Sequence, residues 1–294
     1  MPLTTAHARS VLTEACNVIG IDCADAGLIR LGENAIFISS PDDVVIRIAR
    51  SMAAMPDARK EIAVSRWLGD TRIAVTTPLD IEQPITVQDR PVTFWHVITD
   101  SGIVVTLPEM ARILKDLHSL PVPDGLRLPA LDMFGRVEQR ITSAEAISDQ
   151  ARRFMLGRLG QLRTDYARLS FDLPPCAVHG DAHDGNFIRT PAGSIVMIDL
   201  ERFAYGQPEA DLTVTATEYL AGWHSAEGYR AFADAYGYDV MQWSGFPVMR
   251  AANELKMTTW LMQNVAEDQE IADEFENRLA SLHDDDAPRH WRPF

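Results

Sequence analysis

The character of the sequence changes near residue 100, and this change sets the predicted fold. Before it, short apolar runs predict strands at 28–32, 35–39, 44–48, 72–76, 84–88 and 91–98, with helical spacing at 5–20 and 57–68. After it, helical spacing dominates from Leu107 onward, including 143–169 and most of 208–282. Only 186–188 and 194–198 favour strands there. We therefore predict an α/β (α+β) chain of two lobes, a strand-rich lobe at 1–100 and a larger, mainly helical lobe at 101–294.

Composition limits the partners and the location. Hydrophobic residues make up 46% of the chain and charged residues 23%, which is typical of a soluble globular protein. The net charge of −15 argues against nucleic acid or an anionic membrane as partner, and fits a neutral or cationic small molecule better. Three cysteines without a CxxC pair predict neither a disulfide framework nor a zinc site. With no signal peptide or membrane span in the sequence, we expect a cytoplasmic protein.

One stretch, CAVHGDAHDGNFIRTPAGSIVMIDLERFAYGQPEADL at 176–212, carries residues suited to phosphoryl transfer. Asp181 follows the apolar Ala177-Val178 and can accept the proton of a substrate hydroxyl. Asn186 and Asp199 offer hard oxygen ligands of the kind that suit Mg²⁺, which binds through few protein groups plus phosphates and water. A short hairpin between residues 186 and 199 would bring these two ligands side by side.

This pattern resembles the aminoglycoside phosphotransferase and choline kinase-like family of the protein-kinase-like superfamily. The resemblance lies in three blocks in order: His179-Gly180-Asp181 through Asn186, then Ile198-Asp199, then Gly-x-Pro-x-x-Asp-Leu from Gly206 to Leu212. It implies a two-lobed kinase-like fold whose small first lobe is a mainly antiparallel sheet with a helix. It also implies that Asp181 is the catalytic base, that Asn186 and Asp199 bind the metal, and that Asp211 anchors the catalytic region.

The same resemblance implies a nucleotide site in the first lobe. Arg47, on a buried strand, and Glu61, on a helix, match the basic and acidic pair that holds nucleotide phosphates in such kinases. Protein kinases have lysine at the first position, but arginine can also bind phosphate in a bidentate manner. The glycine-rich loop is absent, and GENAIF at 32–37 occupies the corresponding turn. The remaining nucleotide-binding candidates are Gly32, Asn34, His96, Ile98 and Ile198.

Several alternatives stay open on the sequence. The segment 94–98 is where the family binds adenine, but it also reads as an apolar strand leaving the sheet. Glu201 either supports the metal or pairs with Arg202, while His118 is interpreted as bracing the catalytic loop and His183 has no assigned role. A metallophosphoesterase would need further His and Asp blocks that the sequence lacks. A protein kinase is disfavoured by the missing glycine-rich loop and the missing Ala-Pro-Glu after Asp199.

The sequence therefore predicts an enzyme, a phosphotransferase that moves the terminal phosphate of ATP or GTP to a hydroxyl of a small molecule, with Mg²⁺. The acceptor is left open among an aminoglycoside or another antibiotic, a sugar and an amino alcohol. The alternative is a catalytically silent kinase-like module that binds nucleotide without turnover. Against that alternative, Asp181, Asn186 and Asp199 are all intact.

Overall fold

The computed structural model describes residues 3–32, 34–39, 43–284 and 287–294. Glu33, within the turn predicted at 32–37, lies outside these residues. The chain forms two compact units. Unit 1 comprises Met1–Val105, Val122–Leu128 and Gly185–Phe203, and unit 2 comprises Thr106–Pro121, Pro129–Asp184 and Ala204–Phe294. Unit 1 contains a small sheet and unit 2 contains many helices, which confirms the predicted fold class. The predicted functional boundary at residue 100 stays a prediction.

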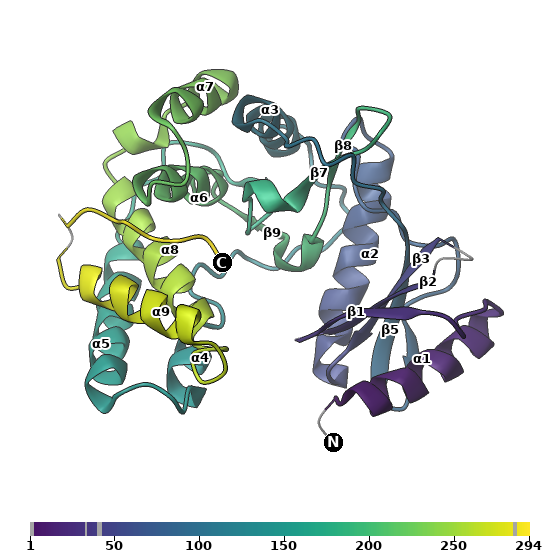
Figure 1. The fold of residues 1–294 in the computed structure, drawn as a ribbon. Coiled ribbons are helices and arrows are strands. Elements are labelled where there is room, and N and C mark those ends of the chain that lie inside the picture. The colour runs from purple at the N-terminus through teal and green to yellow at the C-terminus, as the bar shows by residue number, and fades with distance from the viewer. Residues whose placement is uncertain (1–2, 33, 40–42, 285–286) are drawn as a thin grey trace. The chain divides into compact units, whose positions relative to one another are not determined.

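Unit 1 is built on one antiparallel sheet of five strands in the order β1-β2-β3-β5-β4 (Figure 1). The strands are β1 (Gly27–Leu31), β2 (Asn34–Ser39), β3 (Val44–Ala49), β4 (Ile85–Val87) and β5 (Arg90–His96). Because side chains alternate along a strand, β3 buries Val44, Ile46 and Ile48 on one face and turns Arg47 to the other.

Two helices use these two faces of the sheet differently. α1 (Thr5–Ile19) packs its apolar side, including Val11 and Leu12, into one core with Ile46 and Ile48. α2 (Met55–Gly69) instead provides the ion-pair partner of Arg47. The sheet therefore has an apolar face under α1 and a charged position opposite it.

A second, two-stranded hairpin belongs to unit 1 although it lies far along the chain. It pairs β7 (Phe187–Arg189) with β8 (Ile195–Met197), which confirms the predicted hairpin. Residues 72–76, predicted as a strand, form only an isolated bridge in which Val75 pairs with Met197. That prediction was wrong because this segment pairs with β8, about 120 residues later, and not with the five-stranded sheet.

Unit 2 is mainly helical. Its helices are α3 (Leu107–His118), α4 (Val137–Ser143), α5 (Asp149–Tyr166), α6 (Glu209–Leu220), α7 (Ala226–Tyr236), α8 (Phe246–Leu261) and α9 (Gln269–Ser281). Its short sheet pairs β6 (Cys176–Val178) with β9 (Ala204–Gly206). Helix α3 begins with a capping box in which Thr106 and Glu109 satisfy each other's backbone N–H groups. β6 leads directly into the His-Gly-Asp sequence of the candidate site.

One disulfide forms, although the cysteine count predicted no disulfide framework. Cys16 and Cys23 are bonded, with their Cα atoms 6.2 Å apart, while Cys176 is a buried free thiol. Gly20 ends α1 in the left-handed conformation at φ 76° and reverses the chain, so residues seven apart in sequence meet. An odd number of cysteines therefore did not exclude one local bridge.

In the described residues, no helix is both long and apolar enough to cross a bilayer. The cytoplasmic location stays a prediction.

Candidate active site

The loop that follows β6 is held by one buried carboxylate of helix α6. Asp211, which is fully buried, accepts the backbone N–H of His179 on Oδ2 and that of Gly180 on Oδ1, each at 2.8 Å. Gly180 lies at φ 80°, a conformation that glycine adopts without the steric cost of a Cβ. The glycine and the aspartate of the sequence pattern therefore fix the backbone immediately before Asp181.

A hydrogen-bonded chain extends this anchor to two further helices. His118 of α3 contacts Asp211 through Nε2 at 3.0 Å, and its Nδ1 lies 2.9 Å from the Tyr236 hydroxyl of α7. Burial alone would raise the pKa of Asp211, but the hydrogen bond and charge of His118, with His179 and the Gly180 N–H, hold it below its usual range. The charged carboxylate is thus the stable form, as the predicted anchoring role requires. The bracing role predicted for His118 agrees with this contact.

In unit 1 the hairpin places the two predicted metal ligands together. The backbone N–H of Ile198 donates to the carbonyl of Asn186 at 2.9 Å, which extends the β7–β8 pairing by one step. Asn186 is buried, whereas Asp199 is exposed and lies at φ 57° in the left-handed region. The hairpin explains why residues 13 apart in sequence lie side by side.

These two residues suit a hard divalent cation. Within the described ranges, no three His, Cys, Asp or Glu side chains are grouped so that they could hold a metal alone. An amide oxygen from Asn186 and a carboxylate from Asp199 instead match the partial protein coordination that Mg²⁺ accepts when phosphates and water complete its shell. The donor set therefore fits Mg²⁺ bound together with a phosphorylated ligand.

The predicted pair of Arg47 and Glu61 is formed in unit 1. Arg47 Nη1 lies 2.5 Å from Glu61 Oε2, and Nη2 lies 3.7 Å from Glu201 Oε2. The pKa of Glu61 is raised to about 7: burial is the largest cause, Glu201 and Asp199 act in the same direction, and Arg47 acts to lower it. One guanidinium thus faces several carboxylates, which leaves negative charge for a cation to offset.

Sequence reasoning missed three contacts that hold this region. The open question on Glu201 considered Arg202 or a metal, but not Arg47. The ammonium of Lys60 on α2 donates to the Glu201 carbonyl at 2.5 Å, and the ring of Trp67 meets Phe203 edge to face. Nothing in the local pattern at Lys60 indicates a partner 141 residues away. Through these contacts α2 fixes both Arg47 and the segment after Asp199.

The other nucleotide candidates lie in unit 1, on or beside the five-stranded sheet and, for Ile198, at the end of the hairpin. Gly32 donates its N–H to the Asn34 carbonyl at 3.0 Å, and its own carbonyl accepts from Arg50 at 2.6 Å. His96 ends β5 with an exposed side chain and donates its N–H to Thr77. These backbone groups are therefore already used within the unit. Ile98 follows β5 half-buried, and Ile198 precedes Asp199.

A second charged group in unit 2 was not predicted. Glu218 of α6 is 5% exposed, and its Oε2 lies 3.0 Å from His224 Nε2. Although burial acts to lower the pKa of His224, the hydrogen bond to Glu218 and the charges of Glu218 and Asp184 raise it above its usual value. His183 and Asp184, from the loop that contains Asp181, also act electrostatically on Glu218. The only sequence signal was a glutamate two helical turns after Asp211.

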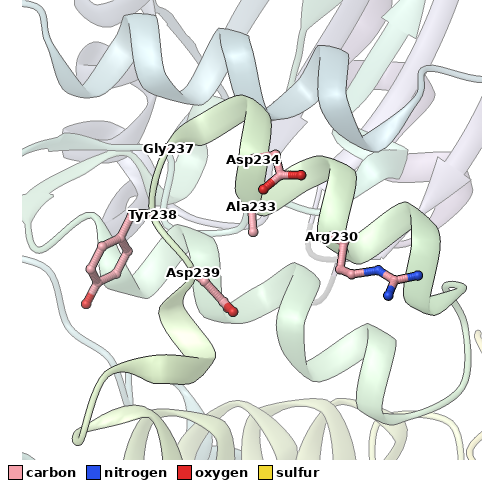
Figure 2. Close-up of a pocket in the computed structure, with 6 residues that line it drawn as sticks. All are labelled: Arg230, Ala233, Asp234, Gly237, Tyr238 and Asp239. Atoms are coloured by element: carbon pink, nitrogen blue, oxygen red, sulfur yellow. The ribbon is translucent and has the colours of Figure 1, made fainter.

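A shallow hollow of about 340 Å³ lies elsewhere in unit 2. Arg230, Ala233 and Asp234 come from α7, and Gly237, Tyr238 and Asp239 follow its end (Figure 2). None of the predicted site residues lines it. The hollow is therefore separate from the predicted site residues.

The anchored His-Gly-Asp loop and the Asn/Asp hairpin are features of a phosphotransferase with a kinase-like fold. A model of the phosphotransferase enzyme family (APH) matches residues 32–252, and the chain belongs to this family. The predicted recognition, and the prediction of a small-molecule phosphotransferase, are confirmed. No curated protein sequence is significantly similar to the chain.

Solved structures share the fold at low sequence identity. An amicoumacin kinase in complex with AMP-PNP, Ca²⁺ and Ami has a TM-score of 0.70 and 14% identity, covering 97% of this chain and 95% of that one. A microcompartment-associated aminopropanol kinase has a TM-score of 0.69 and 17% identity, over 92% and 95% of the two chains. The choline kinase LicA from Streptococcus pneumoniae has a TM-score of 0.62 and 16% identity, over 94% and 99%.

Proposed function

We propose that the chain transfers the terminal phosphate of ATP or GTP to a hydroxyl group of a small molecule. The observation that carries this proposal is the buried Asp211 holding the backbone before Asp181, in a chain of the phosphotransferase family. The similar structures include an amicoumacin kinase, an aminopropanol kinase and a choline kinase, and further ones are complexes with GDP. They support a small molecule with a hydroxyl group as the acceptor. They identify neither the particular acceptor nor the nucleotide, ATP or GTP.

In this proposal Asp181 accepts a hydrogen bond from the acceptor hydroxyl and orients its oxygen toward the terminal phosphorus. As the new oxygen–phosphorus bond forms, the bond to the departing nucleoside diphosphate breaks and the hydroxyl proton passes to the Asp181 carboxylate. The anchor at Asp211 limits the positions that Asp181 can take, which reduces the entropy lost on reaching the reactive geometry.

Arg47 would bind phosphate oxygens with its guanidinium, oriented by Glu61. Asn186 and Asp199 would hold Mg²⁺, which when bound offsets the charge that develops on the phosphates. Gly32, Asn34, His96, Ile98 and Ile198 remain proposed nucleotide contacts.

The test is the substitution Asp181→Asn, which keeps the shape of the side chain but removes the proton acceptor. We expect kcat to fall by about 10² to 10⁴ while nucleotide affinity stays within about twofold. The matched control is Asp234→Asn, an exposed aspartate of unit 2, which should leave both quantities unchanged. A kcat for Asp181→Asn within a factor of a few of the wild type would rule out the role as base.

The catalytically silent alternative makes a different prediction. If the chain is catalytically silent, it should bind nucleotide. It should release no nucleoside diphosphate with any acceptor in a screen of antibiotics, sugars and amino alcohols. Release that depends on one acceptor contradicts that alternative.

A further inference from the structure

The sheet of unit 1 carries a second arginine in line with Arg47. In the strand register, Arg30 of β1 pairs with Ile36 of β2, and Ile36 pairs with Arg47 of β3. Residues directly opposite each other on neighbouring strands project from the same face of a sheet. Arg30 and Arg47 therefore flank the half-buried Ile36 on the face opposite the apolar core, two strand spacings or about 10 Å apart.

An irregularity in β1 places Arg30 on this face. Between Leu28 and Arg30 the pairing with β2 shifts by one residue. Without the shift, the pairing of Leu28 with Phe37 would set Arg30 opposite Ala35, which is buried in the core under α1. Such β-bulges re-aim side chains and are frequent beside active sites. The local backbone therefore turns Arg30 out of the core and onto the face of Arg47.

The turn that follows Arg30 uses its own backbone groups internally. The Gly32 N–H donates to the Asn34 carbonyl at 3.0 Å, and the Gly32 carbonyl accepts from Arg50 at 2.6 Å. The side chain of Arg30 reaches this turn, because its Nε would lie 3.5 Å from a Cβ at Gly32. In protein kinases a glycine-rich loop covers the phosphates at such a turn. Here the Gly32 N–H is already used, and a guanidinium lies beside it.

Neighbouring charges act differently on the two arginines. Arg47 lies 2.5 Å from Glu61, and Glu201 and Asp199 also act on it electrostatically. Arg30 is exposed, and among the residues that the structure describes it has no carboxylate partner and no hydrogen bond. The guanidinium of Arg47 is therefore shared with carboxylates, whereas that of Arg30 can exchange its water for the oxygens of an anion.

Resting on the proposed function, we propose that Arg30 is a second phosphate-binding residue for the nucleotide. It takes the place of the backbone donors of the absent glycine-rich loop. Its planar fork of N–H groups can bind two phosphate oxygens at once, as that of Arg47 can from the other side of Ile36. The contact through Arg50 keeps the turn in place beside Arg30.

The experiment compares a triphosphate with its nucleoside by calorimetry in the presence of Mg²⁺. ATP and adenosine form one pair, and GTP and guanosine form the other, because the preferred base is open. For Arg30→Gln we expect the Kd of the bound triphosphate to rise by about tenfold or more, since charge-assisted hydrogen bonds are lost. The Kd of the corresponding nucleoside, which has no phosphate, should stay within about twofold.

Two further variants sharpen the comparison. Arg30→Lys keeps the charge but not the planar fork, so its Kd for the triphosphate should fall between those of the wild type and Arg30→Gln. Lys also replaces Gln as the test if Arg30→Gln does not fold. The matched control is Arg66→Gln, an exposed arginine of α2 in the same unit, which should leave both dissociation constants unchanged.

The outcomes separate this proposal from the proposed function. Unchanged triphosphate affinity in folded Arg30→Gln overturns the role of Arg30 and leaves the phosphotransferase intact. That result with new self-association would mean that the charge only protects an edge strand, and with lower stability it would mean that Arg30 has a protein partner. Equal weakening of triphosphate and nucleoside also overturns the proposal, because it indicates general damage to the sheet. A wild type that binds neither ATP nor GTP overturns the proposed function itself.

Discussion

At the scale of single residues, Asp199 has an unusual backbone. Its φ of 57° lies in the left-handed region, where a residue other than glycine pays about 1 kcal/mol or more. Its side chain makes no capping hydrogen bond to the short helical turn that follows it, Leu200–Arg202. Local structure therefore does not explain the aspartate, whereas the proposed role in metal binding would explain it.

This leads to a prediction for Asp199→Gly. Because glycine adopts positive φ readily, we expect the free energy of unfolding without ligands to stay equal or to rise by about 0.5–1 kcal/mol. Mg²⁺-dependent nucleotide binding, measured by calorimetry, should disappear. Asp80→Asn, an exposed aspartate of unit 1, is the control for the loss of one negative charge. Strong destabilisation with unchanged nucleotide affinity would instead assign Asp199 a structural role.

Glu61 gives a pH-dependent prediction. Since burial raises its pKa in the folded chain from 4.5 to about 7, the folded state binds this proton more tightly than the unfolded state. Its stabilising contribution is therefore complete below about pH 4.5 and is lost as the pH rises through about 7. We expect the stability of the wild type relative to Glu61→Gln to fall across this window by at most about 3 kcal/mol. Denaturant unfolding of both proteins at several pH values measures this, and a constant difference would show that Arg47 keeps Glu61 charged throughout.

At the scale of elements, the pairing of β6 with β9 positions the start of the catalytic loop. Gly206 pairs with Cys176, and a Cβ at Gly206 would lie 2.5 Å from the Cβ of Leu131. The Leu131 N–H also donates to the Tyr205 carbonyl at 2.8 Å, which keeps that side chain close to β9. The glycine of the Gly-x-Pro pattern is thus required for close packing beneath β6.

We accordingly expect Gly206→Ala to lower the free energy of unfolding by about 1–3 kcal/mol, because β9 must move away from Leu131. Gly157→Ala is the matched control: it lies within α5 with no atom near the added Cβ, and should raise stability by about 0.5–1 kcal/mol. Adding Leu131→Ala should recover part of the loss in the Gly206 variant. Denaturant unfolding of the four proteins checks these values, and a neutral Gly206→Ala would show that β9 can shift at little cost.

The elements also show what the sequence could predict. The apolar pattern predicts β3, with Arg47 on the face opposite to the buried Ile46 and Ile48. Helical spacing predicts α2, and the spacing of Asn186 and Asp199 predicts their hairpin. These features depend on neighbouring residues. The contact of Lys60 with Glu201 and the pairing of Val75 with Met197 depend on segments far apart in the chain. No local pattern specifies such contacts, because tertiary packing decides them.

At the scale of the whole molecule, each unit contains part of the proposed chemistry. Unit 1 contains Arg47, Glu61, Asn186 and Asp199, and unit 2 contains Asp181 and its anchor Asp211. The chain passes from one unit to the other between Asp184 and Gly185, within the pattern that runs from Asp181 to Asn186. The proposed base and metal ligands are therefore joined by a few residues of chain.

The central claim is phosphoryl transfer to a hydroxyl group with Asp181 as the base. The most direct measurement is ³¹P NMR of the products formed from ATP, Mg²⁺ and an acceptor that stimulates ADP release, with wild type and Asp181→Asn side by side. We predict a phosphate monoester on the acceptor hydroxyl, formed in equal amount to ADP by the wild type and at a rate lower by about 10² or more in the variant. Inorganic phosphate in place of the monoester, or equal monoester formation by both proteins, would contradict the account.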